Sequence, residues 1–265
     1  MMGDGLTRLL VQASVYAPLT RRFLIDAGIA PAMRVLDVGS GGGDVAFIAA
    51  ELVGPDGCVV GIEGLPERAE AAQERARAAG HSHVSFVAAN IDTLQAPGEF
   101  DAIIGRFVLR ELRDPAAALR RLSEGLVAGG VVAFQEKILS QPVVSFPTSP
   151  ALATLVGWMD EARREGGVEL AMGAKLPALF EDAGFARPSV RIESPIGVGG
   201  DWVGIDYLVE AARGMLPLFD IFEIAEAAEV DLDAARAAVR RELGDVGVVV
   251  LSPVVGACSR AARAD

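Results

Sequence analysis

The residue types with the clearest chemical potential stand in one short run, where an apolar, β-branched segment gives way to a helical pattern. The run begins with Asp37 and continues through Gly39-Ser40-Gly41-Gly42-Gly43. Glycines at a strand-to-helix turn let a ligand approach the backbone, and the N–H groups of a starting helix favour polar ligand groups. The run therefore predicts a nucleotide-like ligand. Alone it does not say which one, because Gly41, Gly43 and Ala46 also satisfy a loose dinucleotide fingerprint.

Asp37 distinguishes the two ligand classes. A carboxylate against this turn would repel a pyrophosphate, but it can hold a cationic amino group. S-adenosylmethionine carries an amino acid end and no phosphate, whereas NAD carries a pyrophosphate. Asp37 therefore favours S-adenosylmethionine.

Two further polar positions follow the next strands. Glu63 comes about 20 residues after the glycine turn, a spacing that suits a carboxylate accepting both hydroxyls of a ribose. NAD would use Glu63 equally well. Asn90 and Ile91 follow the third strand, where a polar side chain and a backbone N–H could bind the edge of an adenine. Asn90 could instead serve only an Asx-turn.

These residues need a scaffold of alternating strands and helices, which is typical of a parallel sheet. Pro66 and Pro115 suit the first turn of a helix, and Asp114 and Asp231 suit N-caps. A loop is expected over 140–149. The expected strands cover 34–38, 58–63, 84–88, 101–105, 130–135, 189–194 and 247–259. The expected helices cover 6–27 with a stop at Gly28, segments starting near 43, 66 and 115, then 151–165, 175–183 and a long helical insertion over 202–243.

In their order along residues 33–136, these motifs resemble those of class I S-adenosylmethionine-dependent methyltransferases of the small-molecule type. The resemblance rests on Asp37 to Gly43, Glu63, Asn90, the run Phe100 to Gly105 and the pair Gly129-Gly130. It implies an α/β, Rossmann-like, doubly wound, seven-stranded and mostly parallel sheet with a reversed final strand. N-terminal helices and a helical insertion before the last strand are added to it. The implied domains are an N-terminal helical lid (1–30) and a methyltransferase domain (31–265) with substrate-side insertions at about 140–175 and 200–245.

The resemblance implies S-adenosyl-L-methionine as cofactor and S-adenosyl-L-homocysteine as product. Asp37, Gly39 and Gly41 would hold the methionine part, with Arg106 lining it. Glu63 would hold the ribose, and Asn90 with Ile91 the adenine. The full cofactor set is Asp37, Gly39, Ser40, Gly41, Glu63, Gly64, Asn90, Ile91 and Arg106. In two respects the sequence departs from the family pattern: Asn90 stands where aspartate is commoner, and Ser40 and Gly42 replace a commoner cysteine and proline.

No residue is assigned as catalytic, because a general base is needed only if the acceptor must lose a proton. Glu136 and Tyr16 are weak candidates, as is Asp206. The expected substrate pocket contains Tyr16, Arg106, Arg110, Glu136, Trp158 and Tyr207. Core packing is the competing interpretation for the aromatic residues. The apolar residues outside the nucleotide core suggest an apolar or aromatic, natural-product-like acceptor.

Charge and composition exclude other classes of partner. The net charge of -12 opposes a nucleic-acid partner, which needs a basic face. The chain shows no leader sequence and no apolar stretch long enough to span a membrane, so a cytoplasmic protein without a membrane partner is expected. His81 and His83 lie in a turn without further ligands, so no metal is expected. The expected partner is a small-molecule acceptor, and a homodimer stays open.

Three alternatives to methyl transfer stay open. An S-adenosylmethionine-binding enzyme of the same fold could catalyse a non-methylating reaction such as cyclisation, with identical cofactor motifs. An NAD-dependent oxidoreductase is disfavoured by Asp37. A non-catalytic binding module is disfavoured by the completeness of the motifs.

Overall fold

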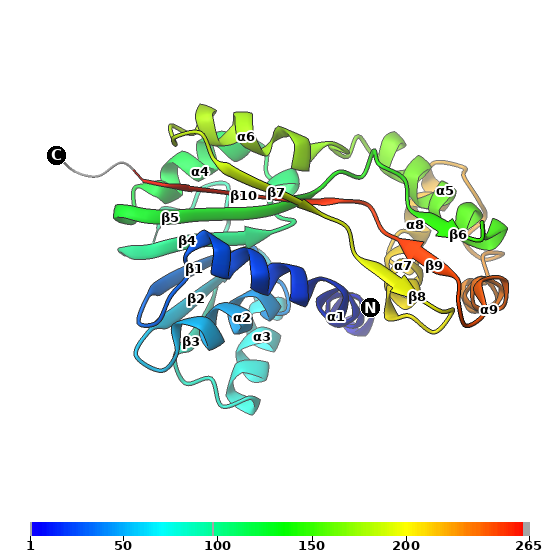
Figure 1. Ribbon diagram of the computed structural model, residues 1–265, viewed down its shortest axis with the longest axis horizontal. Coiled ribbons are helices and arrows are strands. Elements are labelled where there is room, and N and C mark those ends of the chain that lie inside the picture. Colours follow the sequence, from blue (N-terminus) through cyan, green and yellow to red (C-terminus); the bar gives the residue numbers. More distant parts are fainter. Residues whose placement is uncertain (1, 97, 262–265) are drawn as a thin grey trace. The chain divides into compact units, whose positions relative to one another are not determined.

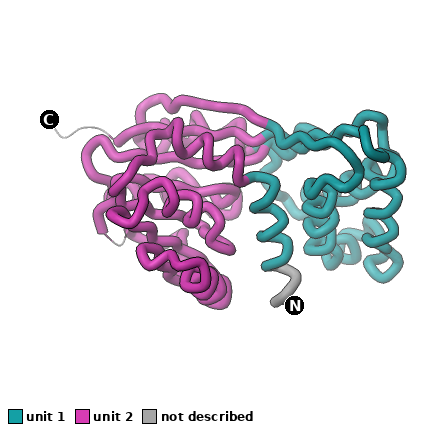
Figure 2. Tube along the Cα trace, turned by 60° about the horizontal axis from the view of Figure 1, so that its bottom comes forward, with its two compact units in different colours: residues 1–16, 138–171, 194–253 teal, residues 17–137, 172–193, 254–265 magenta. Residues whose placement is uncertain are grey.

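The computed structural model describes residues 2–96 and 98–261, which form two compact units (Figure 2). Of the described residues, unit 1 comprises 2–16, 138–171 and 194–253, and unit 2 comprises 17–96, 98–137, 172–193 and 254–261. Each unit therefore combines segments that are distant in the sequence. None of the described helices is both long enough and apolar enough to cross a membrane.

Unit 2 is built on a seven-stranded sheet with the order β3-β2-β1-β4-β5-β10-β7 (Figure 1). Neighbouring strands are parallel except at β10, which runs antiparallel to both β5 and β7. This confirms the predicted Rossmann-like sheet with a reversed final strand. The strands are β1 (Arg34–Val38), β2 (Cys58–Glu63), β3 (Val84–Ala88), β4 (Phe100–Arg106), β5 (Leu126–Lys137), β7 (Ser189–Glu193) and β10 (Val254–Arg260).

Helices cover both faces of this sheet. On one face, residues of α1 and α2 share a buried core with the strands. On the other face, α6 packs on β5 and β10, and α4 packs on α6. The helices of this part of the chain are α1 (Met2–Ala27, which continues into unit 1), α2 (Asp44–Val53), α3 (Pro66–Ala78), the 3-10 helix η1 (Leu109–Glu111), α4 (Pro115–Ser123) and α6 (Met172–Asp182).

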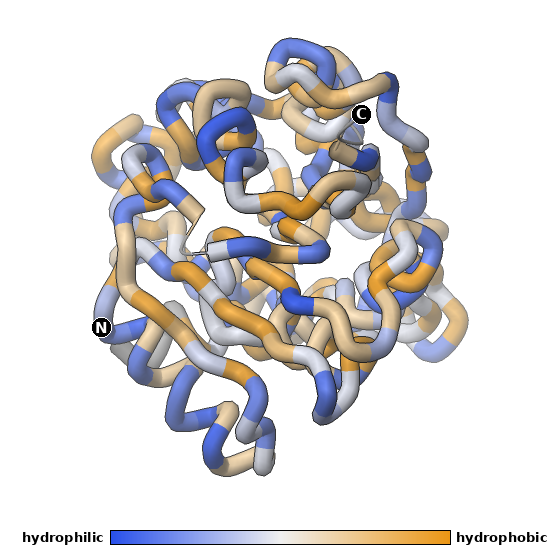
Figure 3. The backbone as a smooth tube through the Cα atoms, turned by 90° about the vertical axis from the view of Figure 1, so that its left-hand side faces the viewer, coloured by the Kyte–Doolittle hydropathy of each residue, from blue (hydrophilic) through white to orange (hydrophobic). Residues whose placement is uncertain are grey.

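Local sequence signals explain several helix ends. Asp114 caps α4 as predicted, because its Oδ1 accepts a hydrogen bond from the N–H of Ala117 at 2.9 Å, and Pro115 occupies the first turn. Gly28 ends α1 with a φ of 92°, a left-handed conformation that suits glycine. Along the chain, hydrophobic stretches alternate with hydrophilic ones, as Figure 3 shows, so that each element can bury one side.

The alternation of side chains along the strands decides which polar groups share a face. Ala102 and Ile104 of β4 and Ala133 of β5 belong to the core under α1 and α2. Arg106 and Gln135 follow them at two-residue intervals and therefore face the same side, as does Asp37 two residues after the core residue Val35. Glu136 faces the opposite side.

Unit 1 contains a three-stranded antiparallel sheet with the order β6-β9-β8. Its central residue Val249 is fully buried, whereas Phe146 and Val198 on the alternate face are mostly exposed. The elements are β6 (Val144–Phe146), β8 (Ile196–Val198), β9 (Val248–Val250), α5 (Pro150–Glu165), α7 (Val203–Arg213), α8 (Leu216–Ile221) and α9 (Leu232–Leu243).

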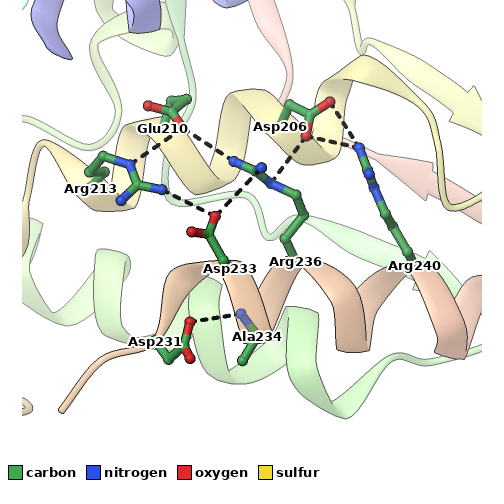
Figure 4. A network of polar contacts seen from close by, with 8 residues as sticks. All are labelled: Asp206, Glu210, Arg213, Asp231, Asp233, Ala234, Arg236 and Arg240. Carbon is green, nitrogen blue, oxygen red and sulfur yellow. Dashed lines mark hydrogen bonds and ion pairs between the residues drawn. The ribbon is translucent and has the colours of Figure 1, made fainter. Parts of the chain in front are cut away.

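A network of ion pairs joins α7 to α9 within unit 1 (Figure 4). Arg236 of α9 contacts Asp206 at 3.2 Å and Glu210 at 3.3 Å, and Arg240 contacts Asp206 at 3.0 Å. Asp231 caps α9 through a 2.8 Å hydrogen bond from the N–H of Ala234, as predicted. These contacts fix the two helices side by side.

The sequence interpretation was wrong in three places. The single strand expected over 247–259 is two strands, β9 and β10, which belong to different sheets; Pro253 lies between them and has no N–H for a ladder. The insertion over 202–243 consists of three helices, and much of the acidic run 223–233, expected on helix faces, forms turns. The expected loop over 140–149 contains β6.

Candidate cofactor and active site

Asp37 is a fully buried carboxylate near the end of β1. Among the described residues, no group donates a hydrogen bond of ordinary length and angle to either of its oxygens. Burial raises the pKa of Asp37 from 3.8 to about 8, and the nearby Arg106 guanidinium and the backbone N–H of Ala46 oppose this rise. Burying a polar group without a partner costs about 1–3 kcal/mol in proteins, and a charge costs more. The Arg106 guanidinium and the Ala46 N–H offset only part of the cost of burying an ionised Asp37, and a cationic ligand group would offset more of it.

Backbone N–H groups of the glycine turn were expected to face a ligand, but several of them bond to other protein atoms. The N–H groups of Gly39 and Ser40 both donate to the carbonyl oxygen of Ile62 at 2.9 Å. The N–H of Gly41 donates to Oε2 of Glu63 at 2.9 Å, and the N–H of Gly43 donates to the Ser40 carbonyl at 2.8 Å. These N–H groups, which we expected to face a ligand, are satisfied within the protein. The turn instead shapes the end of β1 and fixes Glu63.

Gly39 shows why this position excludes larger residues. Its φ of 71° is left-handed, and a Cβ at this position would overlap the side chain of Val108. The next residue, Ser40, is buried, and its hydroxyl has no hydrogen-bond partner in the part of the chain that the structure describes. In addition to the Asp37 carboxylate, this hydroxyl is a second buried polar group with which a ligand could form a hydrogen bond.

Glu63 lies at the end of β2 with both carboxylate oxygens engaged. In addition to the Gly41 bond, its Oε1 accepts a 3.2 Å hydrogen bond from the N–H of Leu65 and lies 3.9 Å from Nη1 of Arg68. Each carboxylate oxygen has about two acceptor sites, so these bonds orient the group without exhausting it. Gly64 directly follows, in the turn before α3.

Asn90 is exposed and forms the Asx-turn that had been the alternative interpretation. Its Oδ1 accepts a 3.0 Å hydrogen bond from the N–H of Asp92. Ile91 beside it is buried. The turn fixes the chain after β3, and the role of Asn90 and Ile91 toward an adenine stays a prediction.

Arg75 of α3 is a residue that the sequence did not single out. Its Nη1 donates to the carbonyl oxygen of Gly42, and its Nη2 lies 2.9 Å from Oδ1 of Asp44. The guanidinium also lies over the ring of Phe47, 5.2 Å from its centroid. Arg75 thus links helix α3 to the glycine turn and to the start of α2. A basic residue on a helix face gives no sequence signal of such a contact.

Arg106, at the end of β4, is the buried cation of the site. Its Nη1 donates to Oγ1 of Thr20 at 3.0 Å, and Thr20 in turn donates to Oε1 of Gln135 at 2.8 Å. Phe107 follows with a φ of 60°, which is unusual for a residue other than glycine. Sequence reasoning identified Arg106 but missed Thr20 and Gln135, since neither belongs to a motif.

Glu136 lies in β5 on the face opposite Arg106. It is fully buried, and its Oε1 accepts a 2.7 Å hydrogen bond from the N–H of Leu109 in η1. Burial raises the pKa of Glu136 from 4.5 to about 7, and Arg110 opposes this rise. Next to it, Nζ of Lys137 lies 4.5 Å from the ring centroid of Phe107. Glu136 therefore anchors the segment that follows β4.

The remaining pocket candidates divide between the units. Tyr16 and Tyr207 of unit 1 are buried and meet edge to face, with ring centroids 5.5 Å apart. Trp158, also of unit 1, packs against Phe219 at 6.2 Å. In unit 2, Arg110 pairs with its neighbour Glu111 at 3.0 Å. The aromatic contacts are those of core packing, and a role toward an acceptor stays a prediction.

Two other groups of candidates have structural contacts. Asp206, a weak candidate base, is held by Arg236 and Arg240 in the network of Figure 4. His81 stacks on Phe47 with ring centroids 5.3 Å apart, and Nε2 of His83 lies 3.2 Å from the carbonyl oxygen of Ala50. Within the described ranges, no group of three or more His, Cys, Asp or Glu residues could hold a metal ion.

By sequence, the chain is similar to a methyltransferase family model and to individual methyltransferases. A family model described as a methyltransferase domain matches residues 29–160. Aklanonic acid methyltransferase DauC of Streptomyces sp. (strain C5) is 34% identical over 138 residues, which cover 52% of this chain and 60% of the relative. The ubiquinone/menaquinone biosynthesis C-methyltransferase UbiE of Vibrio parahaemolyticus is 31% identical over 181 residues, which cover 63% and 70%. The chain thus spans less than two thirds of the length of DauC.

Solved structures share the fold. The [4+2]-cyclase SpnF superposes with a TM-score of 0.60 at 20% identity, covering 99% of this chain and 95% of SpnF. Coclaurine N-methyltransferase, bound to N-methylheliamine and S-adenosylhomocysteine, gives a TM-score of 0.57 at 14% identity, covering 92% and 72%. The sheet order, with the carboxylates of Asp37 and Glu63 near the ends of β1 and β2, is that of a Rossmann-like domain. The chain belongs to the class I S-adenosylmethionine-dependent methyltransferase family, and its cofactor is S-adenosylmethionine.

Proposed function

We propose that this protein transfers a methyl group from S-adenosylmethionine to a small apolar or aromatic acceptor. The observation that carries the proposal is the pair Asp37 and Arg106: a buried carboxylate to which no described group donates a hydrogen bond of ordinary length and angle, beside a buried guanidinium. A zwitterionic amino acid end matches such a pair, because Asp37 can accept its ammonium group and Arg106 can donate to its carboxylate. A pyrophosphate does not match it.

The residues of the site act by binding and orientation. The cofactor, when bound, supplies an electrophilic methyl group on a sulfonium. Asp37 and Arg106 would hold the methionine end, and Glu63 would accept the ribose hydroxyls while the bonds from Gly41 and Leu65 keep it in place. Holding reactants in line can contribute about 7–11 kcal/mol to a barrier. Methyl transfer therefore needs no dedicated base unless the acceptor carries a proton that must leave.

The nature of the acceptor is supported by the similarity to DauC. DauC, which matches over 138 residues, is named for aklanonic acid. This similarity favours a natural-product-like acceptor over a charged one.

A second reaction class keeps the same cofactor site. SpnF, whose name states a [4+2]-cyclase activity, shares the fold over nearly the whole chain. Cyclisation and methyl transfer are distinguished by the fate of the methyl group, so one experiment separates them.

The test is a transfer assay with S-adenosylmethionine labelled in its methyl group and a panel of phenolic, polyketide-like and charged acceptors. We expect label in an apolar or aromatic acceptor, with S-adenosylhomocysteine formed in equal amount. Calorimetry runs in parallel on the same protein. Tight S-adenosylmethionine binding without label transfer to any acceptor would favour a non-methylating reaction, and binding of NAD instead would overturn the proposal.

A further inference from the structure

Three polar side chains form a buried chain of hydrogen bonds in unit 2. Arg106 of β4 and Gln135 of β5 are register partners in the parallel ladder, so their side chains lie next to each other on one face. Helix α1 covers this face, and its residue Thr20 bonds to both of them. All three side chains are buried.

The chain has a fixed direction. A guanidinium can only donate, so Arg106 Nη1 donates to Oγ1 of Thr20 over 3.0 Å. The Thr20 hydroxyl must then direct its own hydrogen to Oε1 of Gln135, over 2.8 Å. Successive bonds of this kind polarise and strengthen one another. A residue between Arg106 and Gln135 must therefore both accept and donate, as a hydroxyl does.

This arrangement bears on the cofactor site through Arg106. Asp37 and Arg106 lie on the same face of the neighbouring strands β1 and β4, and the guanidinium opposes the rise that burial causes in the pKa of Asp37. An arginine side chain has many rotamers, and immobilising such a side chain on binding costs about 0.5–1.5 kcal/mol. Holding the guanidinium in place before the ligand arrives avoids that cost.

We propose that Thr20 is a positioning residue for cofactor binding: through its hydroxyl, helix α1 orients Arg106 toward the carboxylate of the methionine part of S-adenosylmethionine. This inference rests on the proposed function, which assigns Arg106 to that carboxylate. Thr20 itself is buried, and its effect passes through Arg106, to which it is hydrogen-bonded.

The test compares two ligands that differ in one group. S-adenosylmethionine and decarboxylated S-adenosylmethionine share the sulfonium, ribose and adenine, but only the first has the carboxylate. Thr20→Val keeps the shape of the side chain and removes the hydroxyl, whereas Thr20→Ser keeps the hydroxyl. By calorimetry, we expect Thr20→Val to bind S-adenosylmethionine about tenfold more weakly and the decarboxylated ligand within about twofold of wild type. Thr20→Ser should keep the wild-type preference.

Controls separate positioning from loss of stability. Leu24→Val, on the same buried side of α1, lowers the melting temperature without touching the hydrogen-bond chain and should keep the preference for the carboxylate. If Thr20→Val does not give folded protein, Gln135→Met removes the acceptor at the other end of the chain and should cause the same selective loss.

The outcomes are distinguishable. Equal weakening of both ligands by Thr20→Val, or the same loss in Thr20→Ser, would overturn the positioning role while leaving the proposed function intact. A wild-type protein that binds S-adenosylmethionine no better than its decarboxylated form would also overturn it, because Arg106 would then not contact the carboxylate. Wild type that binds neither ligand would overturn the proposed function as well.

Discussion

Asp37 and Arg106 extend from the neighbouring strands β1 and β4 on the same face of the sheet, close enough that the guanidinium lowers the pKa of the carboxylate. Burial nevertheless dominates and raises the pKa of Asp37 to about 8. The free protein therefore stabilises the ionised form of Asp37 only partly, and a bound ligand can stabilise it further. An ammonium group beside Asp37 would complete the charge balance of the pair.

This relationship predicts a pH-dependent affinity for the cofactor. Below pH 8 Asp37 is mostly protonated, and binding an ammonium group requires that proton to leave. Affinity for S-adenosylhomocysteine should therefore rise between pH 6 and pH 8, by up to about tenfold per pH unit. Calorimetry across this range measures it. Asp37→Asn is the control, because the amino group of the ligand titrates equally in both proteins; the same slope in the variant would contradict the assignment.

The same carboxylate should cost stability in the free protein. Its pKa is higher in the folded than in the unfolded chain, so the folded state holds a proton that the unfolded state releases between about pH 4 and pH 8. The contribution of Asp37 to the free energy of unfolding therefore falls over that window as pH rises. We expect Asp37→Asn to raise the melting temperature at pH 8 and to flatten this dependence. Asp56→Asn, at an exposed position, should do neither. A less stable Asp37→Asn protein would show that the buried carboxylate has a structural partner.

Glu63 should affect the nucleoside end of the cofactor rather than the methionine end. Glu63→Gln replaces one acceptor oxygen by a donor, which then faces the N–H of Gly41 or Leu65. A hydrogen bond to a charged group contributes about 1.5–3 kcal/mol, so affinity should fall roughly 10-fold to 100-fold. The loss should be equal for S-adenosylhomocysteine and for 5′-methylthioadenosine, which lacks the amino acid end. A loss confined to S-adenosylhomocysteine would place Glu63 elsewhere.

Much of the fold could be predicted from the sequence because its signals are local. The strand-turn-helix around Gly39 and the caps Asp114 and Asp231 follow from short-range patterns, whereas the reversed last strand was implied by the family resemblance. The break between β9 and β10 could not be read in the same way. Val248 to Val255 is one apolar stretch in the sequence, and only pairing with two different sheets divides it.

The candidate site shows the same division between local and distant information. Asp37, Glu63 and Arg106 stand at strand ends, where position in the motif already indicates their role. Thr20 and Gln135 lie 86 and 29 positions away from Arg106, and only the packing of α1 and the β4–β5 register brings them to it. Periodicity predicts that Thr20 lies in a helix, but not what lies opposite it.

Glu136 has two competing roles, structural anchor or general base, and substitutions at this position distinguish them. Because it is fully buried and lies on the face opposite Asp37 and Arg106, we expect it to act by accepting the N–H of Leu109. Glu136→Ala should then lose about 1–3 kcal/mol of stability, the cost of leaving a buried N–H unsatisfied, and activity with it. Glu136→Gln keeps an acceptor oxygen, so its kcat should stay near that of wild type.

The pH dependence of stability gives Glu136→Gln a second readout. The pKa of Glu136 is raised to about 7 in the folded protein, so its contribution to stability is lost as pH rises from about 4.5 to 7. Glu136→Gln removes that loss and should melt at a higher temperature than wild type at pH 8. A kcat reduced by 10²-fold or more at unchanged cofactor affinity, about the contribution of a general base, would instead assign Glu136 to proton removal from the acceptor.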